Sequence, residues 1–220
     1  MSTMNLLTPI TPEAFSERAV GRLLASPAPD SFDPLVTPRH GDHNLAGRLA
    51  PLDGAMHRAA AVLIPIVAHP VGASILLTRR AEHMKDHAGQ IAFPGGKMDA
   101  ADKSPLNTAL REAQEEIGLD RRFIAPLGYL DPYLSSSGFR IVPVVAMVDP
   151  AHRLTLDPGE VASTFEVPLG FLMDPKRHET HEREWRGAMR RYYAMPYGDY
   201  YIWGITAGIL RNLYEKVYGE

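Results

Sequence analysis

Three carboxylates, Glu112, Glu115 and Glu116, lie within five consecutive positions of the stretch ALREAQEEIGL. Like charges three or four residues apart on a helix repel each other, by about 0.2–0.5 kcal/mol per pair. Clustered carboxylate oxygens suit Mg²⁺ or Mn²⁺, and such cations help water to attack phosphate and diphosphate groups. The alternative is a solvated acidic helix face. Two features favour the metal: no basic residue follows four positions later, and the loop FPGG comes just before the helix, where backbone can approach a ligand closely.

The helix that carries these carboxylates is predicted for residues 105–117. At 100° per residue the three glutamates share one side of the helix. Gly118 occupies the position where a left-handed residue ends a helix. The helix should therefore expose an acidic face beside an apolar stripe that packs on the core, formed by Leu106, Leu110, Ala113 and Ile117.

Short β-branched runs on both sides of this helix predict the strands that position it. The expected strands cover residues 60–67, 72–78, 123–133, 139–148, 191–195 and 199–204, and a second helix covers residues 205–218. The first two strands should pair, and the last two should form a hairpin. Mixed strands with a few helices predict an α/β fold of the mixed α+β type, with a mixed central sheet flanked by helices.

The N-terminal part differs in character from the rest. Thr11 is suited to cap a helix that begins at Pro12, and residues 27–51 are rich in Pro, Asp, His and Gly, as an irregular connector is. We therefore predict an N-terminal helical extension and connector over residues 1–50 and one larger domain over residues 51–220.

Charge and composition narrow the function classes. The chain has 220 residues, a net charge of −3 and no cysteine. This charge gives no electrostatic reason to expect binding to nucleic acid or to an anionic membrane, and the missing cysteine excludes disulfides and thiolate chemistry. The N-terminus lacks the pattern of a secretory signal, and prolines interrupt the most apolar run, residues 59–77. We expect a cytoplasmic protein acting on a small molecule.

The segment GGKMDAADKSPLNTALREAQEEIGL resembles the Nudix box, which reads Gly, five residues, Glu, seven residues, then Arg-Glu-aliphatic-x-Glu-Glu-x-Gly-aliphatic. From Arg111 to Leu119 the match is close, and only the small Ala113 departs from it. In the first half, the position of the box glutamate falls on Lys103, and Gly96 lies one residue further away than usual. Asp102 is adjacent to Lys103 and is the candidate substitute.

A second segment, LLTRRAEHMKDHAGQIAFPGG, is similar to the additional signature of the coenzyme A pyrophosphatase branch of the Nudix hydrolases. Every fixed position is met except the second arginine, which is Lys85 here. Lysine keeps the positive charge but loses the bidentate geometry of arginine toward phosphate. The two segments together run from Leu76 to Leu119.

The resemblance implies a Nudix-type α/β/α sandwich and a role for individual residues. Glu112 and Glu116 are the implied metal ligands, and Glu115 is a third ligand, a general base or a surface residue. A carbonyl of Gly95 or Gly96 is expected to complete the coordination. Glu160 is implied as a further acid or base, unless it only starts a turn. The implied phosphate-binding cations are Arg79, Arg80 and Lys85, whereas Arg111 is expected to pair with an acid such as Asp102.

The function that follows is hydrolysis of the diphosphate of coenzyme A and its thioesters, with Mg²⁺ or Mn²⁺, to 3′,5′-ADP and (acyl-)4′-phosphopantetheine. The same chemistry on another nucleoside diphosphate, such as ADP-ribose or a dinucleotide, is the first alternative. A Nudix-fold binding module without catalysis is the second, and the intact set of three glutamates argues against it. We expect no nucleic-acid or membrane partner; a homodimer is compatible with the sequence.

Overall fold

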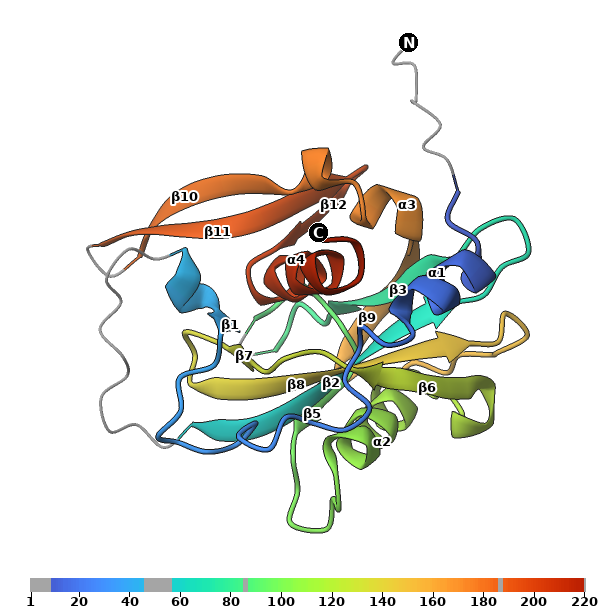
Figure 1. Ribbon diagram of the computed structural model, residues 1–220, viewed down its shortest axis with the longest axis horizontal. Helices are drawn as coiled ribbons and strands as arrows, with labels where there is room; N and C mark the ends of the chain where they lie inside the picture. The colour runs from blue at the N-terminus through green and yellow to red at the C-terminus, as the bar shows by residue number, and fades with distance from the viewer. Residues whose placement is uncertain (1–8, 46–56, 85–86, 186–187, 220) are drawn as a thin grey trace.

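The computed structural model describes residues 9–45, 57–84, 87–185 and 188–219. It contains one large mixed sheet, one small antiparallel sheet and helices on both faces of the large sheet (Figure 1). The prediction of a mixed α/β fold is therefore confirmed. Within these ranges no helix has both the length and the apolar character needed to cross a membrane.

The large sheet is built around two long parallel strands, β2 (Arg58–Val67) and β8 (Phe139–Val148), which pair along their whole length. Its path runs β1-β7-β8-β2-β3-β4, with β5 on β2, β6 on β8 and β9 on β3. The predicted pairing of the first two strands is confirmed, because β3 runs antiparallel to β2. The remaining strands are β1 (His40–Gly41), β3 (Ser74–Arg80), β4 (Ile91–Ala92), β5 (Gly95–Lys97), β6 (Ile124–Tyr129), β7 (Tyr133–Leu134) and β9 (Val161–Pro168).

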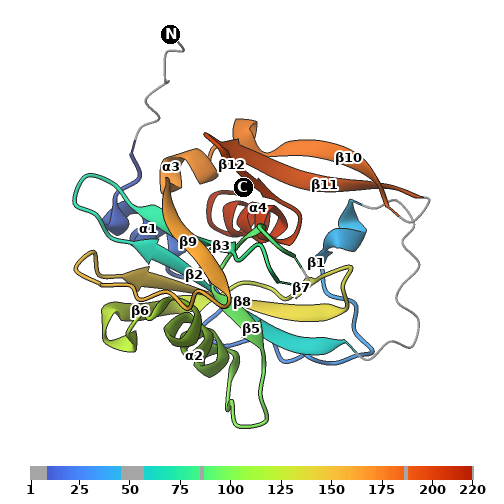
Figure 2. The ribbon, with the colours of Figure 1, turned by 180° about the vertical axis from the view of Figure 1, so that it is seen from behind.

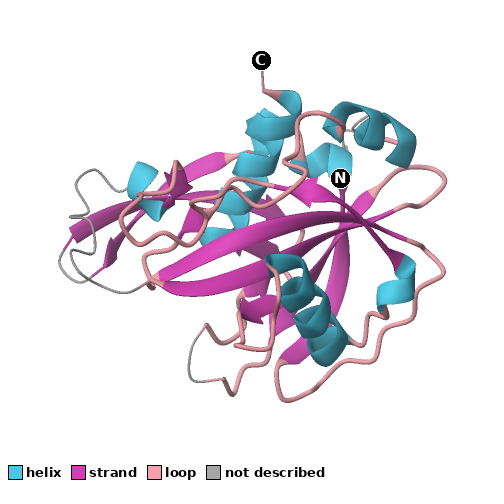
Figure 3. Ribbon diagram, turned by 60° about the horizontal axis from the view of Figure 1, so that its bottom comes forward, coloured by secondary structure: helices cyan, strands magenta, loops and turns pink. Residues whose placement is uncertain are grey.

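Two long helices cover opposite faces of this sheet, α2 (Pro105–Ile117) and α4 (Ile205–Tyr218) (Figures 1 and 2). A compact apolar layer lies between the sheet and α2, and α2 contributes Ala109, Ala113 and Ile117 to it. The face toward α4 carries a larger apolar cluster. Helix, sheet and helix form the expected α/β/α sandwich, and Figure 3 shows α2 lying across the strands. Shorter helical turns are α3 (Leu169–Leu172), η1 (Asp42–Asn44), η2 (Arg121–Phe123) and η3 (Pro175–Arg177).

A second, three-stranded sheet covers the side of α4 that faces away from the large sheet (Figure 2). Its strands are β10 (Glu179–Trp185), β11 (Ala188–Tyr197) and β12 (Tyr200–Trp203). The predicted hairpin is confirmed by the antiparallel pairing of β11 with β12. Met195 and Ile202 on this hairpin are fully buried in the cluster that includes α4. As a result, α4 lies between two sheets.

The N-terminal helix α1 (Pro12–Ala19) begins as expected, with the Thr11 side chain accepting a hydrogen bond from Ala14 N at 3.2 Å. Phe15 is fully buried and belongs to the same apolar cluster as α4. Arg18 Nε also donates to the carbonyl oxygen of Val217 at the end of α4, at 3.2 Å. The predicted boundary between residues 50 and 51 lies outside the described residues and stays a prediction.

Candidate active site

Helix α2 carries the acidic cluster, and its ends are fixed by local sequence signals. The Ser104 side chain accepts a hydrogen bond from Asn107 N, and Pro105 occupies the first turn. Gly118 ends the helix in the left-handed conformation, with φ of +66°, where a side chain would be strained. The predicted bounds of residues 105–117 are confirmed.

Strand β5 brings backbone against the two inner carboxylates of this helix. Gly95 N donates to Glu116 Oε2 at 3.1 Å. A Cβ atom added to Gly96 would lie 2.5 Å from Glu112 Cδ, and one added to Gly95 would lie 2.5 Å from the carbonyl oxygen of Ala61. At Gly95 the neighbouring backbone leaves room for glycine alone, and at Gly96 the missing side chain lets Glu112 lie directly against β5.

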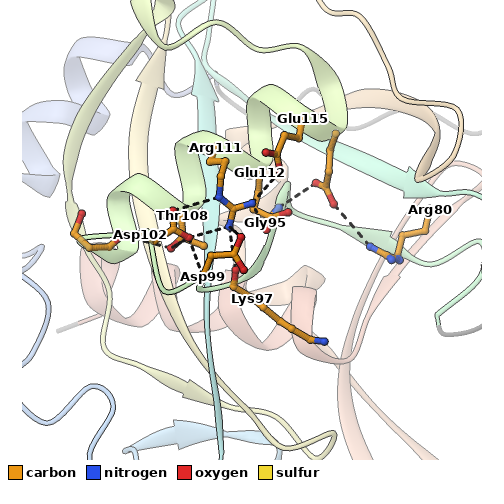
Figure 4. A network of polar contacts seen from close by, with 11 residues as sticks. Arg80, Gly95, Lys97, Asp99, Asp102, Thr108, Arg111, Glu112 and Glu115 are labelled. Carbon is orange, nitrogen blue, oxygen red and sulfur yellow. Dashed lines mark hydrogen bonds and ion pairs between the residues drawn. The ribbon is translucent and has the colours of Figure 1, made fainter.

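Arg111 connects the acidic face to the loop that precedes the helix (Figure 4). Its Nη1 contacts Glu112 Oε1 and Glu115 Oε2, each at 2.9 Å. Its Nη2 donates to the Lys97 carbonyl oxygen at 3.1 Å. The guanidinium therefore holds two carboxylates on one side and the loop backbone on the other.

Asp102 is the main partner of Arg111, which confirms the expected pairing. Arg111 Nη2 lies 2.8 Å from Asp102 Oδ2, and Arg111 Nε lies 3.2 Å from Asp102 Oδ1. The Thr108 hydroxyl donates to the same carboxylate at 2.9 Å. The hydrogen bond from Arg111 is the main cause that lowers the pKa of Asp102 to about 2. Lys103 is exposed, so Asp102 provides the carboxylate that Lys103 lacks.

Glu116 is a buried carboxylate with too little positive charge around it to balance its own charge. Its side chain is only 4% exposed. Burial raises its pKa to about 7, and the charges of Glu112 and Glu160 add to this effect, against the Gly95 N–H and Arg80. Burial is also the main cause that raises the pKa of Glu112. A divalent cation would relieve this excess of negative charge.

The donor set fits Mg²⁺ or Mn²⁺, because carboxylate and backbone carbonyl oxygens are the ligands these cations prefer. Glu112 and Glu116 are four residues apart on one helix face, next to the Gly95–Gly96 backbone. In the described part of the chain, no three His, Asp or Glu side chains converge on one metal position. Coordination by these two glutamates would therefore also need backbone or solvent oxygens.

The predicted phosphate-binding residues fall into different environments. Arg80 Nη1 lies 3.9 Å from Glu116 Oε1, so Arg80 belongs to the same site. Arg79 points elsewhere: it is 48% exposed and pairs with Glu82 at 2.7 Å. Lys85 lies outside the described residues.

The two remaining predicted acids lie nearer the surface. Glu115 is 58% exposed and contacts Arg111. Glu160 is exposed in the turn before β9, and its carbonyl oxygen accepts a hydrogen bond from Ala81 N at 2.9 Å. Its charge acts on both Glu112 and Glu116. The roles of Glu115 and Glu160 as base or ligand stay predictions.

Sequence reasoning missed two members of the network. The hydroxyl of Thr108 supports Asp102, and Asp99 Oδ2 lies 3.8 Å from Arg111 Nη2. Thr108 could have been found from its position three residues before Arg111, on the same side of the helix. Asp99 lies in an irregular loop, where spacing carries no such signal.

The sequence has relatives among known proteins. A model of the NUDIX domain family matches residues 56–188. The chain therefore belongs to the Nudix family.

It is similar to a protein of Yersinia pestis (strain Pestoides F) named "Uncharacterized Nudix hydrolase NudL", with 43% identity over 163 residues that cover 74% of this chain and 81% of the relative. A protein of the same name from Yersinia pseudotuberculosis serotype O:1b (strain IP 31758) gives the same values. The chain is thus a Nudix pyrophosphohydrolase.

Similar solved structures include DR0079 from Deinococcus radiodurans, with a TM-score of 0.48 and 12% identity, covering 76% of this chain and 90% of that one. The NUDIX domain of Shewanella oneidensis NrtR complexed with ADP ribose has a TM-score of 0.41 and 20% identity, covering 54% and 77%.

Proposed function

We propose that this enzyme hydrolyses the diphosphate of coenzyme A and acyl-coenzyme A, with Mg²⁺ or Mn²⁺, to 3′,5′-ADP and (acyl-)4′-phosphopantetheine. The observation that supports it best is the position of Arg80, a fixed residue of the coenzyme A-type signature. Its guanidinium lies 3.9 Å from Glu116, the most deeply buried glutamate of the Nudix box. The signature thus supplies a positively charged side chain beside the carboxylates proposed to hold the metal.

In this proposal Glu112 and Glu116 hold the cation, together with a carbonyl oxygen of Gly95 or Gly96. A bound divalent cation neutralises phosphate oxygens and lowers the pKa of a coordinated water. Arg111 fixes the Glu112 and Glu115 carboxylates through its Nη1 contacts at 2.9 Å.

The proton of the attacking water goes to Glu115 or Glu160, the two acids near the site that are open to solvent. A base must reach its proton directly or through one water. Arg80 and Lys85 bind the phosphates, and one donor of Arg80, its buried Nε, has no hydrogen-bond partner among the described residues.

Product analysis with coenzyme A tests the proposal. Purified protein is incubated with coenzyme A, acetyl-coenzyme A, ADP-ribose and a diadenosine polyphosphate, each with Mg²⁺, with Mn²⁺ and with a chelator. We expect 3′,5′-ADP and 4′-phosphopantetheine in equal amounts from coenzyme A, only when metal is present. Much faster turnover of ADP-ribose or of the dinucleotide would contradict the substrate assignment.

Glu116→Gln separates an enzyme from a binding module. This variant should remain folded and lose at least about a hundredfold in kcat. Lys103→Gln is the matched control, since Lys103 is exposed; its turnover should equal that of the wild type. Wild-type protein without turnover on any of the four substrates would favour a binding module.

A further inference from the structure

Arg80 and a metal ion at Glu116 would compete for the same carboxylate. We propose that Arg80 is the internal counter-ion of Glu116 in the metal-free protein, that a divalent cation displaces it, and that the displaced guanidinium then binds the phosphate of the substrate. This inference rests on the proposed function, because it assumes the metal position at Glu112 and Glu116. It adds a coupling between metal binding and substrate binding that passes through one side chain.

The backbone directs Arg80 toward the acidic face. Strand β3 pairs with β9 in regular register down to Arg79 and Ser163, and the register then shifts so that Arg80 lies opposite Val161. The extra residue, Ala162, lies on β9, and along β3 successive side chains point to opposite faces of the sheet. Arg79 is 48% exposed and pairs with Glu82, whereas Arg80 is 23% exposed and faces Glu116. Two neighbouring arginines therefore have different roles.

The contact between Arg80 and Glu116 is weak enough for a metal ion to replace Arg80 as the partner of Glu116. Its distance of 3.9 Å is too long for a hydrogen bond, so charge attraction alone holds the pair. Glu116 Oε2 already accepts from Gly95 N at 3.1 Å, and Oε1 is the oxygen that faces Arg80. A cation bound at Oε1 would thus come close to the guanidinium, and the two positive charges would repel each other.

Once it has moved away from Glu116, the guanidinium has donors to offer a phosphate. In the described part of the chain its Nε is buried without a partner, and a free guanidinium fork matches a phosphate group with two parallel hydrogen bonds. The metal therefore both activates the diphosphate and releases the residue that holds it. Because coupling between two ligands is reciprocal, a bound phosphate should in turn strengthen metal binding.

The direction in which the Mn²⁺ affinity changes when Arg80 is replaced tests this exchange. Mn²⁺ is titrated into substrate-free wild type, Arg80→Gln and Arg80→Lys, and free Mn²⁺ is followed by electron paramagnetic resonance. If Arg80 competes with the metal, Arg80→Gln should bind Mn²⁺ about five- to tenfold more tightly. Arg80→Lys keeps the charge and should remain near the wild type. Arg122→Gln is the control for net charge, because Arg122 is 73% exposed and pairs with Asp120.

Weaker Mn²⁺ binding in Arg80→Gln would overturn the proposal, since Arg80 would then only hold Glu116 in place. Unchanged binding would also overturn it. The second half is tested with 3′,5′-ADP: Mn²⁺ should increase its affinity more for the wild type than for Arg80→Gln, because only the wild type adds the released guanidinium to the direct contact of metal and phosphate, and an equal increase in both would contradict the release of Arg80. No Mn²⁺ binding to the wild type would instead refute the metal site itself, and with it the proposed function. Circular dichroism of each variant verifies that it is folded.

Discussion

Arg111 and Asp102 form a two-point ion pair, with Nη2–Oδ2 at 2.8 Å and Nε–Oδ1 at 3.2 Å. This ion pair links the loop before α2 to the helix that carries the acidic face. The same guanidinium contacts Glu112 and Glu115, so the position of the loop and the orientation of these carboxylates depend on each other. The predictions below concern this arrangement and the core that supports it.

Asp102→Ala should lower the free energy of unfolding by about 3 kcal/mol, because it leaves a partly buried guanidinium without its main partner. Urea unfolding of the metal-free protein measures this loss. Asp99→Ala is the control: Asp99 is 69% exposed and 3.8 Å from Arg111, so its loss should cost less than about 1 kcal/mol.

The double variant Asp102→Ala, Lys103→Glu tests which position carries the supporting carboxylate. The side chain at residue 103 is exposed, whereas that of Asp102 is half-buried, so restoring the usual glutamate at residue 103 should not restore stability. Full recovery would mean that the loop can shift its register by one residue.

The stability of the metal-free protein should fall as pH rises from about 4.5 to 7. The pKa of Glu116 is raised to about 7 from an ordinary 4.5, so in this window the folded state holds a proton that the unfolded state has lost. The decrease reaches at most about 3 kcal/mol and levels off above pH 7. Urea unfolding at a series of pH values measures it.

Two controls assign this pH effect to Glu116. Glu116→Gln should make the free energy of unfolding nearly independent of pH between 4.5 and 7. Saturating Mg²⁺ at pH 8 should raise the free energy of unfolding of the wild type but not that of this variant. A variant profile as steep as that of the wild type would place the titrating group elsewhere.

Gly96→Ala and Gly95→Ala should have different effects. The new Cβ at residue 96 meets the end of the Glu112 side chain, which can move; we expect a loss of less than about 1 kcal/mol in stability and weaker Mn²⁺ binding. At residue 95 the Cβ meets the Ala61 backbone at a φ of +155°, and the cost should be about 1–3 kcal/mol. Urea unfolding and Mn²⁺ titration measure both; equal losses of stability would contradict the geometry of β5.

Phe15→Ala tests whether α1 is part of the folded unit. Phe15 is fully buried in the cluster that contains α4, so its truncation should cost about 3–5 kcal/mol in a single unfolding transition. Val20→Ala serves as the control, because Val20 is 75% exposed. A loss below about 1 kcal/mol for Phe15→Ala would instead make α1 a separable appendage.

Local signals made α2 predictable to the residue. Ser104, Pro105 and Gly118 each act within one turn of the helix, so spacing alone locates both ends. The mixed sheet was also predictable, because its central strands are apolar runs with little ambiguity. The pairing of Arg111 with an acid beside Lys103 followed from the motif, since a carboxylate one residue away can take the place of the usual glutamate.

Other elements had no local signal. Strand β10 has the mostly polar sequence ETHEREW, and among the described residues it pairs with β11 alone, so tertiary context decides its structure. The Gly95–Lys97 segment was expected as a loop, but it is strand β5, which pairs with β2; glycine predicts turns, and the pairing comes from β2. The register shift opposite Arg80 depends on β9, which is more than 80 residues away in the chain.

The burial of α4 between two sheets also bears on how the protein is made. Phe15 packs into the cluster of α4, and Arg18 bonds to the carbonyl of Val217. A ribosome releases residues 12–19 long before residues 205–218 exist, and until then the apolar faces of α1, the large sheet and the β11–β12 hairpin have no helix to cover them. Because these faces stay open to non-native contacts until the last helix is made, the N-terminal helix cannot complete its packing during most of the synthesis of the chain.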